Sequence, residues 1–279
     1  MSGLNARAHT AICFAESPPP REATPFTRPF FQCAATWNSE STASIKHLRK
    51  VRCALRCGRI CMAMGKVLRQ YPPIYHLKVV LAGANPPIWR QLRVPGNANL
   101  GWLHAVLQVA MGWTNSHLHH FLTSDARYTD PLHNEDMGFG EEPDRDEMKA
   151  TLMQIAPNKD AQFGYEYDFG DSWEHEITVE KILPPDPAAA ATALCLDGAC
   201  ACPPEDCGGI WGYANLLKIL KNRKHPEHKD MKAWIGGSFD AETFDLEDIN
   251  LWLRKLKWPR VTEAQLRKVL MGRAGYKEE

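Results

Sequence analysis

The fold of this chain is constrained most by one stretch, Tyr165–Ile182, which reads YEYDFGDSWEHEITVEKI. Two runs rich in aromatic and β-branched residues flank the pair Gly170-Asp171. Such runs on either side of a glycine-containing turn signal are typical of a β-hairpin. The sequence therefore predicts two antiparallel strands in the middle of the folded part.

The turn length follows from the register that places apolar side chains on one face. A two-residue loop at Gly170-Asp171 mixes apolar and charged side chains on both faces. A three-residue loop, 170–172, gives three apolar or aromatic pairs: Phe169 with Trp173, Tyr167 with His175, and Tyr165 with Ile177. Because a slip by one residue would turn the whole apolar set to the wrong side, we predict the three-residue loop.

The reverse face of the predicted hairpin is acidic. It carries two carboxylate pairs, Asp168 opposite Glu174 and Glu166 opposite Glu176. Like charges directly opposite each other destabilise a sheet. This face is therefore either open to water, where screening weakens the repulsion, or covered by a cation or a basic partner. The sequence favours the solvated face.

The segments around the hairpin predict an α+β fold, a mostly antiparallel sheet with helices on one face. Residues 75–81, 88–94 and 119–123 have strand patterns. Asn99 is placed to cap a helix that ends at Met111, before Gly112. A short helix precedes the hairpin, and Thr262 and Gln265 are placed as a capping box. Helical segments follow the hairpin over 213–221, 229–235, 246–256 and 263–271.

Charge divides the chain into two parts. Residues 1–70 contain 11 Lys and Arg against 3 Asp and Glu, and the rest of the chain contains 22 against 30. We predict a disordered or spurious N-terminal extension over 1–70 and a single α+β domain over 71–279. The extension resembles an organellar transit peptide, or translation begins at Met62 or Met64. Its Cys and Trp content favours the second interpretation.

Composition excludes several classes of protein. No run of eighteen apolar residues predicts a transmembrane helix, so no membrane partner is expected. The net negative charge of the body argues against a DNA-binding groove as its main feature, although a local basic patch is compatible with it. No secretory signal is recognisable. We therefore expect an intracellular, cytoplasmic protein with reduced thiols, or organellar import if residues 1–70 are used.

Four cysteines lie within thirteen residues: Cys195, Cys200, Cys202 and Cys207. Zinc takes four Cys or His ligands, but no pair here has the usual spacing of two residues. Two interpretations remain, a zinc site on Cys195, Cys202 and Cys207, or packed free thiols, which the sequence favours. No other cofactor is expected.

Polar residues that could form a site cluster around the hairpin: His117, His119, Asp168, Asp171, Glu174, Glu205 and Asp206. In a strand, His117 and His119 would point the same way. With Asp171 or Glu174 they would complete a two-His-carboxylate metal site, the alternative being partly exposed strand histidines. Glu205 and Asp206 either cap the next helix, which is favoured, or act as general acid and base.

Other polar and aromatic side chains have simpler roles. His175 falls on the apolar face, where we expect it to donate to a backbone carbonyl. Arg90 or Arg93, beside the second strand, could contact an anion. Six tryptophans are expected in the core or in a groove: Trp89, Trp113, Trp173, Trp211, Trp234 and Trp252.

Several uncommon blocks occur in one order: PPIWRQLRVP (86–95), LHAVLQVAMGW (103–113), HLHHF (117–121), YDFGDSWEH (167–175), CPPEDCGG (202–209), WGY (211–213) and FDLEDIN (244–250). Through them, residues 73–256 resemble the plasmid pRiA4b ORF-three-like family. The resemblance implies an α+β fold and uncharacterised proteins encoded on plasmids and mobile elements, but no catalytic residues. A basic residue is commoner in the family at Cys200, which makes it the weakest ligand of the four.

Two functions follow. The first is a non-enzymatic accessory or interaction domain that binds a protein or nucleic-acid partner of a mobile element. The second is a metal-dependent hydrolase or nuclease-like enzyme that uses the histidines and carboxylates of the sheet. The resolvase label sometimes attached to the family is rejected, because no folded N-terminal domain presents a nucleophilic serine with supporting arginines.

Overall fold

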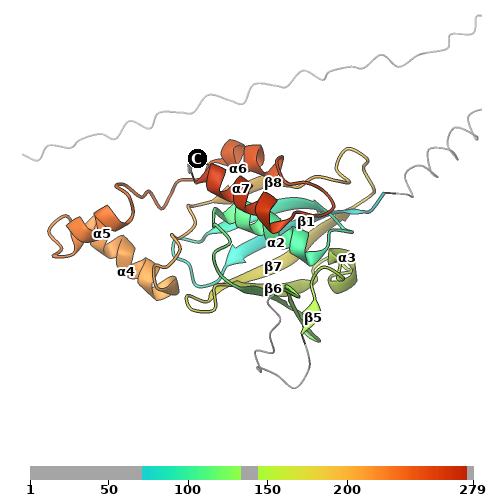
Figure 1. Cartoon of the computed structure of the whole chain (residues 1–279), viewed down its shortest axis with the longest axis horizontal. Coiled ribbons are helices and arrows are strands. Elements are labelled where there is room, and N and C mark those ends of the chain that lie inside the picture. The colour runs from blue at the N-terminus through green and yellow to red at the C-terminus, as the bar shows by residue number, and fades with distance from the viewer. Residues whose placement is uncertain (1–70, 133–143, 275–279) are drawn as a thin grey trace, which may run out of the picture. The chain divides into compact units, whose positions relative to one another are not determined.

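An eight-stranded sheet is the frame of the described part of the chain (Figure 1). The computed structural model describes residues 71–132 and 144–274. By its contacts the chain divides into 1–53 and 54–279, and the described residues all belong to the second unit. The predicted N-terminal extension over 1–70 lies outside the described residues.

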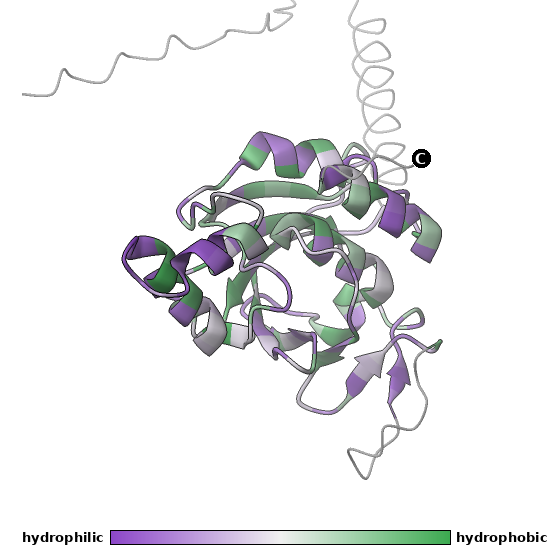
Figure 2. Cartoon of the chain, turned by 60° about the vertical axis from the view of Figure 1, so that its left-hand side comes forward, coloured by the Kyte–Doolittle hydropathy of each residue, from purple (hydrophilic) through white to green (hydrophobic). Residues whose placement is uncertain are grey.

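The strands of this sheet are joined in the order β5-β4-β3-β6-β7-β1-β2-β8. Every neighbouring pair is antiparallel except β4 with β5. Their bounds are β1 Ile74–Leu81, β2 Trp89–Pro95, β3 His119–Leu122, β4 Arg127–Thr129, β5 Arg145–Asp146, β6 Gln162–Tyr167, β7 Trp173–Leu183 and β8 Leu194–Ala199. In Figure 2 the long central strands are largely hydrophobic, whereas β4 and β5 are mostly hydrophilic.

Helices α2, α6 and α7 lie over one face of the sheet, and α4 packs against α5 beyond one end of it (Figure 1). The predicted α+β class is therefore confirmed. The helices are α2 Leu100–Met111, α3 Leu152–Ile155, α4 Gly209–Lys221, α5 His228–Trp234, α6 Leu246–Leu253 and α7 Glu263–Arg273. The predicted caps of α2 and α7 are also confirmed: Asn99 accepts from the backbone N–H of Trp102, and Thr262 and Gln265 form a capping box.

The central hairpin exists, but its register differs from the predicted one by two residues. Tyr167 pairs with Trp173 and Tyr165 with His175, so the connection spans 168–172. Phe169 lies in this turn and is 39% exposed instead of facing Trp173. A shift of two residues keeps every side chain on its face. Trp173 is accordingly buried on the apolar side, as the pattern predicts.

The turn is longer because Asp168 leaves the strand. Its backbone is left-handed, with φ of 60°, and its side-chain oxygen accepts from the amides of Gly170 and Asp171. The amide of Ser172 donates to the carbonyl of Asp168 and closes the turn. A short acidic side chain that satisfies nearby amides is a common way to build such a turn.

The reverse face of the hairpin matches the solvated alternative. Glu174 and Glu176 are exposed, and Glu166 opposite Glu174 is partly buried. Glu166 lies 3.0 Å from Nε2 of His120 and accepts from the hydroxyl of Ser172. The predicted four-carboxylate cluster is therefore reduced to one directly opposed pair, Glu166 and Glu174, because Asp168 belongs to the turn.

The cysteine-rich segment begins with an edge strand, β8, which the sequence did not predict. β8 pairs with β2 and places Cys195 opposite Leu92. On the outer side of β8, the Asn250 side chain from α6 accepts from the backbone N–H of Cys195 and donates to its carbonyl. The segment is thus held on both sides, by pairing with β2 and by the Asn250 side chain.

Arg90 on β2 is buried, at 3% exposure, and its guanidinium donates to backbone carbonyls. Its Nε donates to the carbonyl of Ala110, at the end of α2. Its two terminal nitrogens donate to the carbonyls of Trp89, Ala199 and Cys200. The partial negative charge at a helix C-terminus favours a cation there. Arg90 therefore joins β2, β8 and the end of α2, and the predicted anion contact stays a prediction for Arg93.

The tryptophans do not share one environment. Trp113 and Trp173 are both buried, with ring centroids 6.0 Å apart. Trp211 and Trp234 are instead 87% and 49% exposed, so they are outside the core, and Trp234 lines a small groove, the other predicted place. They lie on α4 and α5, which leave the main sheet. No helix in the described part of the chain has the length and apolar character needed to cross a membrane.

Candidate functional site

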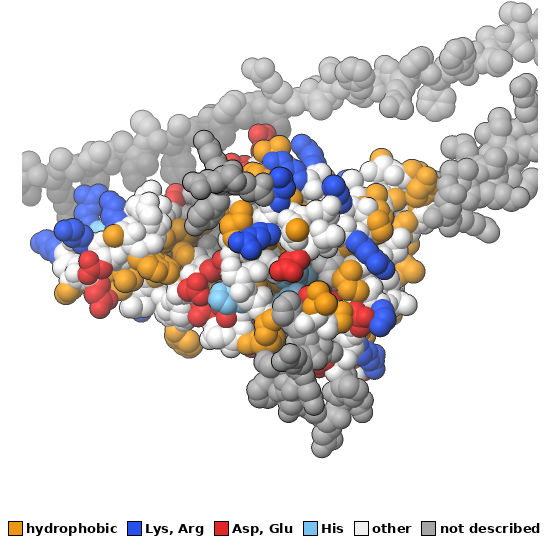
Figure 3. All heavy atoms as spheres, viewed as in Figure 1, with side chains coloured by type: hydrophobic (Ala, Val, Ile, Leu, Met, Phe, Trp, Pro, Cys, Tyr) orange, Lys and Arg blue, Asp and Glu red, His pale blue; other side chains and the backbone are white. Residues whose placement is uncertain are grey.

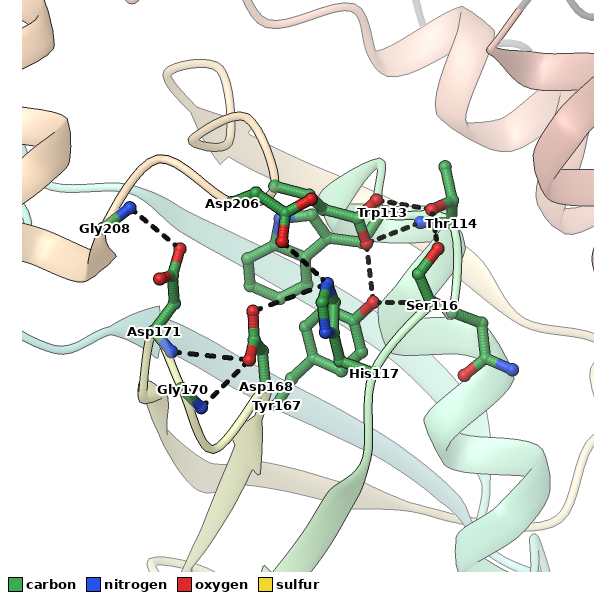
Figure 4. Close-up of polar contacts among 12 residues, drawn as sticks. Trp113, Thr114, Ser116, His117, Tyr167, Asp168, Gly170, Asp171, Asp206 and Gly208 are labelled. Atoms are coloured by element: carbon green, nitrogen blue, oxygen red, sulfur yellow. Dashed lines mark hydrogen bonds and ion pairs between the residues drawn. The ribbon is translucent and has the colours of Figure 1, made fainter.

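Three connecting segments meet at one end of the hairpin (Figure 4). They are the loop that follows α2, residues 112–118, the hairpin turn, residues 168–172, and the loop between β8 and α4, residues 200–208. The amide of Asp168 donates to the carbonyl of Leu118, which ties the first segment to the second. Residues distant in sequence are thereby brought to one place.

His117 lies between two carboxylates in this region. Its Nε2 is 3.6 Å from Oδ2 of Asp168 and 3.2 Å from Oδ1 of Asp206. Figure 4 shows the imidazole pointing between the two acids. The ligand atoms of these three residues all lie within 4.8 Å of one another. We call this set the His117 group.

Asp171 and Glu205 hold the loops together. Oδ2 of Asp171 accepts from the amide of Gly208. Glu205 accepts from the amide and the hydroxyl of Thr114 and from the hydroxyl of Tyr167. Burial, together with Glu205, raises the pKa of Tyr167, so this phenol stays protonated and donates.

The prediction that Glu205 and Asp206 cap the next helix is wrong. Gly208 is the N-cap of α4, and no side chain caps that end. Glu205 turns toward Thr114 and Tyr167 instead, and Asp206 turns toward His117. Contacts with Thr114 and His117, in the loop after α2, therefore hold both carboxylates away from the start of α4.

Gly209 sets how closely the last loop approaches the hairpin turn. Its φ is +65°, and a Cβ at this position would overlap the backbone oxygen of Asp171. We expect Gly209→Ala to lower the free energy of unfolding by about 3 kcal/mol, the sum of left-handed backbone strain and overpacking. Gly236→Ala is the control, because Gly236 is also left-handed but faces open space. It should lose only about 1 kcal/mol in the same urea titration. Equal losses would show that the contact with Asp171 has no energetic weight.

A second polar centre lies in a cleft of about 1090 Å³ beside α2 and β3. Its described lining includes His104, His117, His119 and His120. Successive strand residues point to opposite faces, so a cleft lined by both His119 and His120 extends around the start of β3. Figure 3 shows histidines beside acidic side chains on this face of the molecule.

His104, His119 and Glu147 form the inner wall of this cleft. The two imidazoles stack with centroids 3.5 Å apart and planes 6° apart. Nε2 of His119 is 2.9 Å from Oε2 of Glu147, and both side chains are buried. Nδ1 of His104 contacts the hydroxyl of Tyr165, and its Nε2 contacts Asn115.

Burial dominates the protonation of this wall. It lowers the pKa of His104 to about 3, with a further contribution from His119. It also raises the pKa of Glu147 to about 7. The sequence pattern did not single out His104 or Glu147. The one available signal was a histidine on the apolar stripe of α2, which requires polar partners when buried.

The predicted joint site of His117 and His119 does not form. β3 begins at His119, so the strand alternation does not reach His117, which turns to Asp168 and Asp206. His119 pairs with Glu147 instead. Glu174 is exposed on the reverse face, away from both histidines. His175 behaves as expected: it is buried, and its Nδ1 lies 3.2 Å from the carbonyl of Tyr165.

The predicted zinc ligands Cys195, Cys202 and Cys207 are free thiols. Burial raises the pKa of Cys195 to about 11 and that of Cys207 to about 12, and it raises that of Cys202 further. Within 71–132 and 144–274, the His117 group is the set of three potential ligands close enough to hold one ion, and it contains no cysteine. A zinc site on the three cysteines therefore stays a prediction, because their ligand atoms do not form such a group in the described residues.

Comparisons with known proteins give a consistent result. Residues 73–248 match the plasmid pRiA4b ORF-3-like protein family. The chain is 36% identical over 191 residues to "Uncharacterized protein y4hQ" of Sinorhizobium fredii, covering 67% of this chain and 95% of that one. A crystal structure of "Protein of Unknown Function MM3350" from Methanosarcina mazei Go1 is 35% identical, with a TM-score of 0.56, and the match covers 63% of this chain and 96% of that one.

These relatives point to no particular activity and do not favour the metal-dependent hydrolase or nuclease-like alternative. The family match covers more than half of the chain and includes the hairpin, the loop after α2 and the loop before α4. The chain therefore belongs to the plasmid pRiA4b ORF-3-like protein family.

Proposed function

We propose that the chain is a non-enzymatic interaction domain whose cleft beside α2 and β3 binds a basic, partly apolar peptide segment of a protein partner. The observation that carries the proposal is the combination of size and charge in one preformed cleft. At about 1090 Å³ the cleft is at or above the upper end of small-molecule sites, which span roughly 300–1,000 Å³. A peptide segment fills such a volume.

The charge of the cleft favours a cationic partner. Its described lining holds one arginine, Arg127, against five acids: Asp130, Asp144, Glu147, Glu166 and Glu263. Asp144 is paired with Arg127, and burial raises the pKa of Glu147 to about 7. The excess of negative charge therefore rests on Asp130, Glu166 and Glu263, and it attracts Lys or Arg and repels phosphate. A protein partner is therefore favoured over a nucleic acid, whose backbone binds to cationic surfaces.

Apolar side chains at the same cleft explain why the partner would not be purely basic. Leu118, Leu132 and Phe169 line it and are 37%, 80% and 39% exposed. Exposed apolar residues that gather at one site mark an interaction surface more often than isolated ones do. A segment that alternates Leu and Arg would satisfy both the apolar and the acidic parts.

The proposal is tested with a fluorescein-labelled peptide of alternating Leu and Arg, titrated with the full chain and followed by fluorescence anisotropy. We expect saturable binding of this peptide, and none of a Leu-Glu peptide of equal length or of a single-stranded oligonucleotide. Binding of the Leu-Glu peptide or the oligonucleotide with similar affinity would overturn the proposal.

Matched variants locate the binding. The double variant Glu166→Gln, Glu263→Gln removes two charges from the lining and should weaken binding about tenfold, or about 1.4 kcal/mol. Glu174→Gln with Glu247→Gln is its control. Glu174 lies opposite Glu166, and Glu247, like Glu263, is in the first turn of a helix, but neither lines the cleft. Equal weakening by both pairs would assign the effect to net charge and not to the cleft.

A further inference from the structure

Nε2 of His117 is shielded from solvent and lacks a hydrogen-bond partner among the described residues. Two carboxylate oxygens lie within 3.6 Å of it, yet neither meets the directional geometry of a hydrogen bond. A buried polar atom without a partner is costly. The atom points instead into the space between two acids, as a metal ligand would.

The spacing of the three ligand atoms suits one ion. Divalent metals bind imidazole nitrogen and carboxylate oxygen at about 2.0–2.2 Å, which places neighbouring ligand atoms roughly 2.8–3.6 Å apart in octahedral or tetrahedral geometry. The distances from Nε2 of His117 are 3.2 Å to Asp206 and 3.6 Å to Asp168, and all three ligand atoms lie within 4.8 Å. The two carboxylates lie at most 4.8 Å apart, and a rotation of the exposed Asp206 side chain would bring its oxygen toward Asp168 and close the site.

Asp168 is prepared for this role by the hairpin turn. Its side chain is 9% exposed, and its Oδ1 accepts from the amides of Gly170 and Asp171. Its Oδ2 has no polar contact in the described part of the chain other than His117. Because two amides hold one oxygen, the other is fixed in direction. Hydrogen bonds that orient a ligand in this way are typical of metal centres.

The other two residues differ in exposure. The Asp206 side chain is 71% exposed, which provides a route of entry for an ion from solvent. His117 also lines the cleft. The nearby carboxylates of Asp171 and Glu205 are already hydrogen-bonded within the loops and are not needed as ligands.

We propose that His117, Asp168 and Asp206 bind a divalent first-row transition-metal ion. The proposal is independent of the peptide-binding function. One imidazole nitrogen with two carboxylate oxygens mixes the ligand preferred by Zn²⁺ and Fe²⁺ with that preferred by Mn²⁺, and it disfavours Mg²⁺ and Ca²⁺, which take oxygen ligands. Three protein ligands leave coordination positions open to water or to a group from a partner in the cleft.

Mn²⁺ is the probe of choice, because the free thiols of this chain would bind Zn²⁺ elsewhere. The full chain, first treated with EDTA and dialysed, is titrated with MnCl₂ while electron paramagnetic resonance follows the free ion. We expect one Mn²⁺ per chain. A thermal shift on addition of Mn²⁺, and none with equal Mg²⁺, should accompany binding. No stoichiometric Mn²⁺ binding would overturn the proposal.

Three variants separate this site from non-specific binding. His117→Gln and Asp206→Asn should each weaken Mn²⁺ binding at least tenfold. Asp206 is exposed, so its variant keeps the test valid if His117→Gln does not fold. His120→Gln is the control, because Nε2 of His120 also faces a carboxylate, 3.0 Å away, but only that of Glu166. Mn²⁺ affinity that is unchanged in Asp206→Asn, or lowered equally in His120→Gln, would overturn the assignment. Binding of the Leu-Arg peptide without metal tests the cleft separately.

Discussion

Replacing Arg90 with methionine is expected to destabilise the protein by roughly 3–5 kcal/mol, because the buried carbonyls that accept from its guanidinium lose donors worth about 1 kcal/mol or more each. Those carbonyls belong to Trp89, Ala110, Ala199 and Cys200. Methionine fills most of the volume, so the loss measures the polar contacts more than a cavity. The free energy of unfolding is measured by urea denaturation at pH 7.5.

Two further variants sharpen this result. Arg90→Lys keeps a positive charge but lacks the planar fork that reaches several carbonyls at once, so it should retain less than half of the stabilisation. Arg93→Met, on the same strand, changes a partly exposed arginine and should cost less than about 1 kcal/mol. If Arg90→Met is no worse than Arg93→Met, the guanidinium does not hold β2, β8 and α2 together.

The second large effect is a loss of stability on mild acidification. Burial lowers the pKa of His104 to about 3 and that of His175 to about 4, from 6.5. Below pH 6.5 the unfolded chain therefore binds protons that the folded chain does not. Stability falls as the pH falls from 6.5 toward 4, by about 1.4 kcal/mol per pH unit for each histidine.

Glu147 opposes this trend. Burial raises its pKa from 4.5 to about 7, so between these values the folded state keeps a proton that the unfolded chain has released. Its contribution to stability therefore falls as the pH rises through that window. Two histidines against one glutamate leave a net loss of about 1.4 kcal/mol per unit between pH 6.5 and 4.5.

Urea denaturation at pH 5.0, 5.5 and 6.0 tests this balance. Glu147→Gln removes the opposing group and should roughly double the slope, to about 2.8 kcal/mol per pH unit. His175→Gln should lower the slope by about 1.4 kcal/mol per pH unit in the same range. Identical slopes in the wild type and both variants would show that these buried groups do not control the acid response.

The main strands and helices were predictable because local signals and burial agree there. The cap at Asn99, the glycine after Met111 and the box at Thr262 each specify a helix end through hydrogen bonds between residues close in sequence. The faces of the hairpin were predictable from alternation even though its register was not. Alternation repeats every two residues, so it cannot distinguish registers that differ by two.

The edge strand β8 could not be predicted from its residues. Its sequence, LCLDGA, contains Asp and Gly, which strands disfavour, and its pairing with β2 is set by contacts from distant segments. Gly198 is required there because a Cβ would overlap the ring of Phe244. Neither Phe244 nor Arg90 is close enough in sequence for local patterns to connect them to this strand.

The candidate site was partly predictable. His117, Asp168 and Asp206 were all in the predicted polar cluster, since polar residues around a strong turn signal gather where loops meet. The sequence could not show which of the polar residues in the predicted cluster would contact one another. Asp168 turns inward because its backbone is left-handed. Glu205 is held by Thr114, which is 91 residues away, and by Tyr167, which is 38 residues away.

The contact between Asn250 and Cys195 has a consequence for self-association. An unpaired outer strand offers amides and carbonyls on which another copy of the chain can add a strand, and natural proteins block such edges. Here a side-chain amide already occupies both backbone groups of Cys195. A strand from a second molecule could pair at this position only by displacing α6, so the helix protects the sheet from growing into a polymer.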